Sequence, residues 1–273
     1  LVEKTMENFD SQIIEPRTEM VIVSPKEKEV NINPYIKKYI DKLVEDIEKI
    51  YLMDTRTLIS ILITLGEILP EKKDQMEKYI DYLKETVDNS GTIKNDLYLT
   101  AYFVEMMEIY GKTTDEVFQR SAQCLLKKSM EAIWSPQLWL NAYILIVLKK
   151  IGVEKKDVER QLTWIKNRIE IEEDNEIWAL AYAFNALNLF GLPTEKLQAK
   201  IISKLQKNHW TCKGTDDITV TAIVYRLLLD AGYTNTNVVE WIKTQMLYLD
   251  GRDFKSLHKI SLLLRAIVEE VVK

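Results

Sequence analysis

The hydrophobic positions of this chain recur about every 40 residues. The segments 98–111, 138–152, 177–191 and 218–232 are apolar nearly all round, and each has a small residue near its start and a glycine ten residues later. The small residues are Ala101, Ala142, Ala181 and Ala222. The same spacing reaches Ser60 in one direction and Ser261 in the other, in two further apolar segments. The chain therefore contains six copies of one structural unit.

A second kind of segment alternates with the first. The stretches 71–87, 113–129, 154–169, 193–208 and 235–247 carry apolar residues three and four positions apart and charged residues elsewhere, which is typical of surface helices. Residues 33–50, with Pro34 in the first turn, provide the sixth such helix. A helix without a polar face is expected to be buried on all sides.

This alternation predicts an all-α fold, an (α/α)6 toroid of six helical hairpins in which an inner barrel of helices lies inside an outer barrel. An open solenoid is the alternative, but it would need terminal repeats with a polar outer face. The terminal units are as apolar as the middle ones, which favours closure.

Residues 1–32 do not share the repeat. The run RTEMVIVSP is β-like and lies between Pro16 and Pro25. We therefore expect a short extended N-terminal arm over 1–32, followed by a toroid domain over 33–273. The chain starts without Met and without a signal-peptide pattern, and we expect it to be one domain of a larger protein.

Composition supports a helical globular domain. Only 8 residues are Gly and 6 are Pro, while 47% are hydrophobic. The net charge of −5 argues against a general nucleic-acid binder. We expect no membrane span, because no apolar run reaches about 18 residues. Cys124 and Cys212 cannot form a disulfide framework and are expected to be buried thiols.

Three segments carry a family resemblance: 98–107, 177–191 and 217–245, the last with Val238, Val239, Trp241 and Ile242. Over residues 50–273 the chain resembles the thioester-containing domain of the alpha-macroglobulin and complement family. That family shares a toroid superfamily with terpenoid cyclases and protein prenyltransferase β subunits. The resemblance implies the toroid fold and an extracellular or cell-surface location.

The chemistry of these families is missing from the sequence. There is no Cys-Gly-Glu-Gln segment, and the loop 131–140 has no His, so thioester chemistry is excluded. The Asp-x-Asp-Asp motif of protonating cyclases is absent, and the order His209, Cys212, Asp216 does not match the zinc ligands of prenyltransferases. With one His and one Cys nearby, these residues and Asp217 make a poor metal site. We predict no metal and no cofactor.

Acidic residues precede most of the inner helices. They are Asp54, Asp96, Glu173, Asp174, Asp216, Asp217, Asp250 and Asp253, here called the acidic rim. In a closed toroid these positions share one rim. Each carboxylate is expected to cap its own helix. Alternatively, together they form an acidic mouth that binds a basic peptide, an amine or a cation.

Function is predicted from these patterns by elimination. No Ser-His-Asp order, phosphate loop or HExxH motif occurs, and the inner helices carry almost no acid for a glycosidase pair. We expect a non-catalytic interaction domain that contacts a protein or basic peptide through the acidic rim or the outer helices. The alternative is an enzyme or small-ligand binder, similar to a terpenoid cyclase or prenyltransferase, that uses the mouth of the toroid.

The two alternatives differ in what the central cavity should hold. Six large aromatic residues fall near the starts of inner helices: Tyr98, Tyr102, Tyr143, Trp178, Tyr182 and Tyr225. If they fill the mouth, a substrate has no site there. A pocket of several hundred Å3, which is the usual size of a ligand site, would favour the enzyme.

Overall fold

The computed structural model of the chain describes residues 34–131, 136–171 and 176–268. Residues Ile32–Lys273 form one compact unit. The arm expected at 1–32 lies outside the described residues, as do Glu173 and Asp174 of the acidic rim.

The described residues form twelve α-helices and no β-strand, which confirms the all-α prediction. The apolar segments become α3 (Thr55–Ile68), α5 (Leu97–Ile109), α7 (Leu138–Lys150), α9 (Ile177–Leu189), α11 (Asp217–Leu229) and α13 (Phe254–Ala266). The amphipathic segments become α2 (Pro34–Ile50), α4 (Glu77–Glu85), α6 (Glu116–Met130), α8 (Glu159–Ile171), α10 (Glu195–Ser203) and α12 (Thr236–Met246). Short 3-10 turns, η1 (Pro70–Met76) and η2 (Lys155–Asp157), precede α4 and α8. None of the described helices combines the length and apolar character that a membrane span needs.

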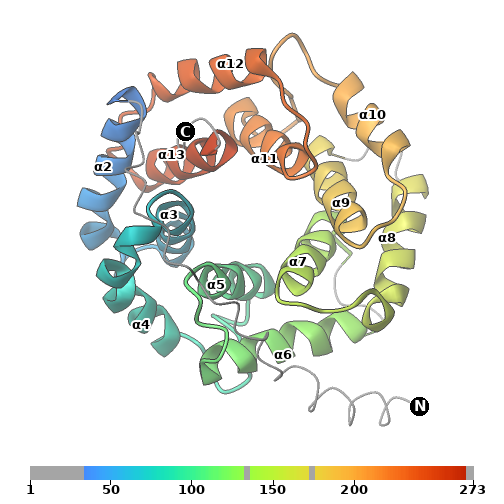
Figure 1. Cartoon of the computed structure of the whole chain (residues 1–273), viewed down its shortest axis with the longest axis horizontal. Helices are drawn as coiled ribbons and strands as arrows, with labels where there is room; N and C mark the ends of the chain where they lie inside the picture. Colours follow the sequence, from blue (N-terminus) through green and yellow to red (C-terminus); the bar gives the residue numbers. More distant parts are fainter. Residues whose placement is uncertain (1–33, 132–135, 172–175, 269–273) are drawn as a thin grey trace, which may run out of the picture. The chain divides into compact units, whose positions relative to one another are not determined.

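The apolar helices pack on one another in chain order. Each of α3, α5, α7, α9 and α11 contacts the next helix of the series, and α13 contacts α3. Figure 1 shows these six helices around a common centre, with the amphipathic helices outside them. Between α3 and α13 the Ser60 and Ser261 hydroxyls are hydrogen-bonded at 2.8 Å, although they are 201 residues apart. The first and last apolar helices are therefore neighbours.

Four of the apolar helices are each followed by a glycine in the left-handed conformation. Gly111 and Gly152 have φ values of +69° and +97°, which a residue with a Cβ rarely adopts. After α5, the N–H of Lys112 donates to the carbonyl of Met107 at 2.9 Å, as in a Schellman motif. The chain reverses direction at these glycines and enters the next outer helix.

The amphipathic pattern at 193–208 predicts a longer helix than the structure contains. α10 ends at Ser203, and the chain then turns inward to Trp210, which is fully buried. The indole Nε1 donates to the Ile201 carbonyl at 2.9 Å, and the Trp210 N–H donates to Thr221 Oγ1 at 3.0 Å. Burial of a large side chain with both of its donors satisfied outweighs helix propensity, which is worth only tenths of a kcal/mol per residue.

Candidate functional site

Four residues of the acidic rim are helix caps. Their side chains accept hydrogen bonds from backbone N–H groups in the first turns of α3, α5, α11 and α13, and they are Asp54, Asp96, Asp216 and Asp253. Asp96 accepts from the N–H groups of both Tyr98 and Leu99, at 2.8 and 3.0 Å. The capping interpretation is correct for these four positions.

Cations lie among the rim carboxylates. Lys259 Nζ is 3.4 Å from Asp216, and the Arg252 guanidinium is 3.4 Å from Asp250. Asp217, the first residue of α11, is 46% exposed at its side chain. The described part of the rim is therefore mixed in charge, and the acidic mouth remains a prediction.

Hydrogen bonds keep the capping carboxylates ionised. Burial raises the pKa of Asp216, but the N–H and hydroxyl of Thr219, together with Lys259, outweigh burial and hold that pKa below its usual value. The Ser256 N–H likewise lowers the pKa of Asp253. Both side chains are acceptors at neutral pH, as helix capping requires.

The residues weighed as metal ligands do not assemble a site. Among the described residues, no group of three or more His, Cys, Asp or Glu side chains is placed to hold a metal ion. His209 Nε2 lies 3.9 Å from the Asp217 carboxylate, and the imidazole stacks on Trp241 at 4.9 Å between ring centroids. Burial raises the pKa of the Cys212 thiol.

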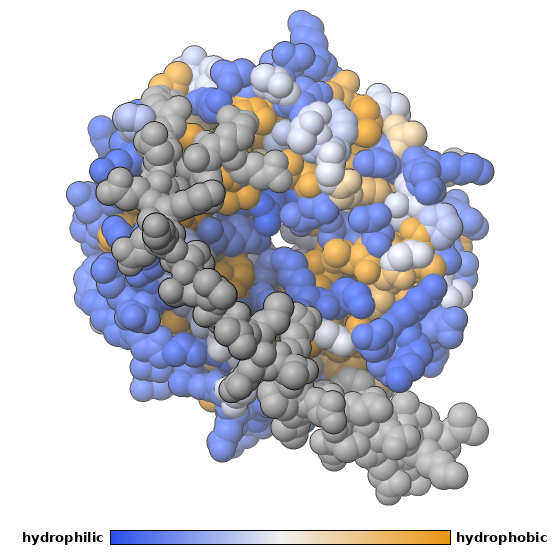
Figure 2. Space-filling model, in the orientation of Figure 1, coloured by the Kyte–Doolittle hydropathy of each residue, from blue (hydrophilic) through white to orange (hydrophobic). Residues whose placement is uncertain are grey.

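Four tyrosines fill the centre of the apolar helices. The Tyr143 ring contacts the rings of Tyr98, Tyr102 and Tyr182. The ring centroids are 5.5 Å apart for Tyr98 and Tyr102 and 5.6 Å apart for Tyr143 and Tyr182. They line a cavity of about 70 Å3, which has room for about two water-sized groups. Figure 2 shows a hollow at the centre of the face that is viewed in Figure 1, with hydrophilic residues beside the hollow.

The other two aromatic residues do not line this cavity. The Tyr225 hydroxyl accepts from the Asn235 N–H at 3.2 Å, in the turn before α12, and Trp178 packs on Trp139 at 5.1 Å. Of the six aromatic side chains considered for the mouth, four line the cavity. Tyr225 lies three residues after Ala222, whereas Tyr102, Tyr143 and Tyr182 each lie one residue after the small residue of their repeat, so the Tyr225 side chain points in another direction.

A buried ion-pair network lies against the same cavity. The Glu105 carboxylate is 3% exposed and contacts Lys150 Nζ at 2.7 Å and Arg265 Nη2 at 3.1 Å, and it accepts from Tyr143 Oη at 2.5 Å. Burial raises the pKa of Glu105, but Lys150 and Arg265 outweigh burial and hold that pKa far below its usual range. Arg265 also contacts Glu67 at 3.3 Å. Side chains of opposite charge are thus paired inside the fold.

This network was not predicted from the sequence, because the inner helices carry few acidic residues. A usable signal exists, because one position of the repeat lies one helical turn after each small residue. It is occupied by Thr64, Glu105, Ile146, Asn185, Arg226 and Arg265. Three of the six are charged within otherwise apolar helices, which points to partners on other apolar helices.

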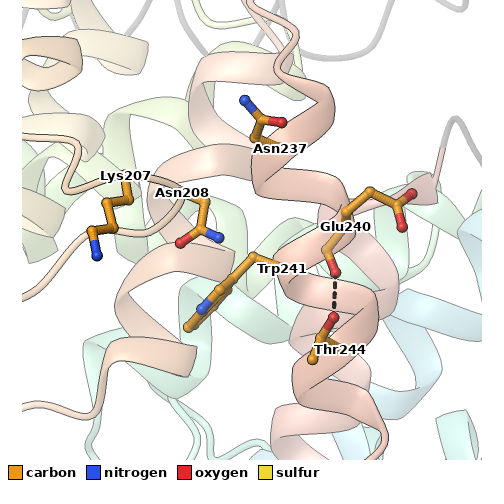
Figure 3. Close-up of a pocket in the computed structure, with 6 residues that line it drawn as sticks. All are labelled: Lys207, Asn208, Asn237, Glu240, Trp241 and Thr244. Carbon is orange, nitrogen blue, oxygen red and sulfur yellow. Dashed lines mark hydrogen bonds between the residues drawn. The ribbon is translucent and has the colours of Figure 1, made fainter.

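A larger depression lies on the outer surface beside α12 (Figure 3). We call it the α12 groove; its volume is about 440 Å3 and it is lined by Lys207, Asn208, Asn237, Glu240, Trp241 and Thr244. The residues come from α12 and from the loop that follows α10. Trp241 entered the sequence analysis as part of a family signature, whereas the groove itself was not anticipated.

Comparison with known proteins adds no family assignment. No protein-family model matches the chain, and no curated protein matches it in sequence. The resemblance to the thioester-containing domain therefore rests on the sequence motifs alone.

Proposed function

We propose that the described helices form a closed (α/α)6 toroid, and that the chain is a domain of the alpha-macroglobulin thioester kind without the thioester. Support comes from the six-fold repeat and from the order of helix contacts, in which α13 returns to α3. The motifs at 98–107, 177–191 and 217–245 carry the family part of the proposal.

Closure can be tested with a disulfide between the first and last inner helices. Ser60 and Ser261 are replaced by Cys in a Cys124→Ser, Cys212→Ser background, and we expect the pair to oxidise because the two hydroxyls are 2.8 Å apart. A Ser60→Cys, Ser129→Cys pair is the control and should keep free thiols. Equal thiol counts in the two oxidised variants would contradict a closed ring.

We infer further that the domain is a non-catalytic interaction module. The observation that carries this inference is the central cavity of about 70 Å3, since sites for drug-sized ligands usually occupy about 300–1,000 Å3. Tyrosine side chains occupy the space where a cyclase-like or prenyltransferase-like enzyme would place its substrate. Binding to a partner through the outside of the molecule does not need that space.

The α12 groove is the surface we propose for partner contact. It has a volume of about 440 Å3 and presents Trp241, which is an anchor residue type at interfaces. Amide, hydroxyl and charged groups surround the indole and can orient a peptide. The acidic rim is the alternative surface, for a basic peptide, although Lys259 and Arg252 neutralise part of it.

A peptide-display selection on the full chain distinguishes these possibilities. We expect selected peptides to lose at least tenfold in affinity when Trp241 becomes Ala, about 1.4 kcal/mol or more, and to be unaffected by Asp216→Lys with Asp217→Lys. Peptides that lose affinity with the two Asp→Lys changes but not with Trp241→Ala would indicate that the acidic rim is the contact surface. Peptides that lose affinity only with Tyr102→Ala, which widens the central cavity, would support the small-ligand alternative.

A further inference from the structure

The two segments that contribute to the α12 groove carry a local excess of positive charge. Residues 195–208 contain four lysines and one carboxylate. The four exposed lysines are Lys196, Lys200, Lys204 and Lys207. α12 adds one carboxylate, Glu240, and one more lysine, Lys243. The whole chain has a net charge of −5, so this surface has a sign opposite to that of the protein as a whole.

The carboxylates of these segments do not neutralise the lysines at the groove. Glu240 lies 2.9 Å from Lys243 Nζ, and no other lysine of the two segments forms an ion pair with a described carboxylate. Figure 3 shows the Glu240 side chain pointing away from Lys207. Glu195 lies in the first turn of α10, more than two helical turns before Lys204. Lys204 and Lys207 can therefore meet the anionic groups of a ligand.

A tight turn holds Lys207 at the edge of the groove. The Gln206 N–H donates to the His209 carbonyl at 2.9 Å, and the His209 N–H donates to the Gln206 carbonyl at 3.2 Å. Lys207 has a φ of +58°, in the left-handed region that glycine adopts at lower cost than a residue with a Cβ. The geometry of the turn by itself does not account for a lysine at this position.

The Trp241 indole is already oriented in the free protein. The His209 imidazole stacks on it, with the ring centroids 4.9 Å apart and the planes 8° apart. His209 Nδ1 lies 3.2 Å from Asn208 Oδ1, and Nε2 lies 3.9 Å from the Asp217 carboxylate. These contacts position the imidazole and, through it, the indole. An anchor that is oriented before binding loses less conformational entropy when the partner arrives.

We propose that the α12 groove binds acidic peptides. One large apolar side chain of the peptide packs on the Trp241 indole, and carboxylates beside it meet Lys204 and Lys207. This inference rests on the groove as the partner surface proposed above, and it adds the class of partner. The aromatic contact supplies most of the affinity, while complementary charge speeds the encounter and disfavours basic segments.

The charge of peptides selected on the full chain from an unbiased display library tests the class of partner. We expect the peptides that lose affinity with Trp241→Ala to have an average net charge of about −3 or more negative. A Trp241-dependent pool that is neutral or basic would overturn the acidic-peptide assignment and leave the groove as the partner surface. If no selected peptide depends on Trp241, the partner surface fails and this inference fails with it.

Charge reversal tests the role of the lysines. Lys204→Glu with Lys207→Glu should weaken binding of the tightest selected peptide at least about tenfold, measured by fluorescence polarisation. Lys155→Glu with Lys156→Glu is the matched control, because it changes the net charge equally at exposed positions of η2 and should alter the affinity less than about twofold. Circular dichroism checks that both variants are folded. Equal losses in the two variants would overturn the inference, since net charge alone would then explain binding.

A fluorescein-labelled oligouridylate distinguishes peptide recognition from general attraction of polyanions. We expect it to bind at least about tenfold more weakly than the selected peptide, because it carries negative charge without the apolar side chain that packs on Trp241. Binding as tight as that of the peptide, and unchanged by Trp241→Ala, would show a general polyanion surface and would overturn the proposal.

Discussion

The α5 segment carries two carboxylates in opposite settings, nine residues apart. Asp96 is exposed and accepts from two backbone N–H groups of its own helix, at 2.8 and 3.0 Å. Glu105 is buried and takes its partners from other helices, namely Tyr143 and Lys150 of α7 and Arg265 of α13. The partners of Asp96 are supplied by local geometry, whereas those of Glu105 exist only when three helices are packed.

The difference matters for stability. A cap that is lost can be replaced by water, because the first turn of α5 lies at the surface. The partners of Glu105 are buried cations, and removing their counter-charge leaves them uncompensated in a medium of low polarity. The carboxylate of Glu105 is therefore expected to contribute more to the free energy of unfolding than that of Asp96. Four predictions are made from this difference.

The largest effect is expected at Glu105. Replacing it by Ala should lower the free energy of unfolding by about 3–5 kcal/mol, the range for breaking a buried ion pair from one side. Urea denaturation at pH 7 measures the change. Glu48→Ala, which removes an exposed partner of Lys78, is the matched control and should cost far less. An equal decrease in the free energy of unfolding of the two variants would contradict a larger contribution from the buried carboxylate.

The second prediction concerns acid and His258. Its pKa is lowered to about 4 in the folded protein, mainly by burial, from an ordinary 6.5. Between these values the unfolded chain binds a proton that the folded chain does not, so stability should fall as the pH drops from 6.5 to 4. The slope approaches about 1.4 kcal/mol per pH unit at most.

Denaturation of His258→Gln across this range checks the assignment, since the variant should lose this part of the pH dependence. The rim behaves differently because the pKa values of Asp216 and Asp253 are lowered from 3.8, so their contribution should be lost only at still lower pH. A wild-type stability that is flat from pH 6.5 to 4.5 would contradict a buried neutral histidine.

A smaller effect is expected at Asp96. Asp96→Ala removes both cap hydrogen bonds and should cost about 1 kcal/mol, within the usual 0.5–2 for helix caps. Asp96→Ser restores an acceptor and should recover most of the loss. Thermal unfolding of the three proteins measures the ranking, and a loss as large as that of Glu105→Ala would show that Asp96 has partners beyond its own helix.

The smallest effect is expected from the rim ion pair. Lys259→Gln separates a cation from Asp216 at a solvent-accessible site, and the unfolding free energy should change by less than about 1 kcal/mol. Because exposed pairs are screened, the remaining difference should vanish at about 1 M salt. A larger change that persists in salt would indicate that the rim cations have a structural role.

Local features of this protein could be read from its sequence. The all-α class follows from helical periodicity, and the turn after α5 follows from Gly111, which adopts the left-handed conformation that glycine tolerates. The caps at Asp54, Asp96, Asp216 and Asp253 are local too, since each carboxylate bonds to N–H groups within three residues.

The candidate sites required the packed helices. Glu105 and Arg265 are 160 residues apart in the chain. They occupy the same position of the repeat, but the repeat does not show which residues pair. The α12 groove likewise depends on where the chain turns after α10 to bury Trp210.

The sequence by itself thus determined the helices, four of their N-terminal caps and their buried faces, because these depend on residues within one or two turns. The tertiary structure alone decided which side chains share the central cavity and how far the tyrosines close it. Those outcomes depend on the rotation of each helix and on side-chain volumes from different repeats, which meet only after the chain has folded.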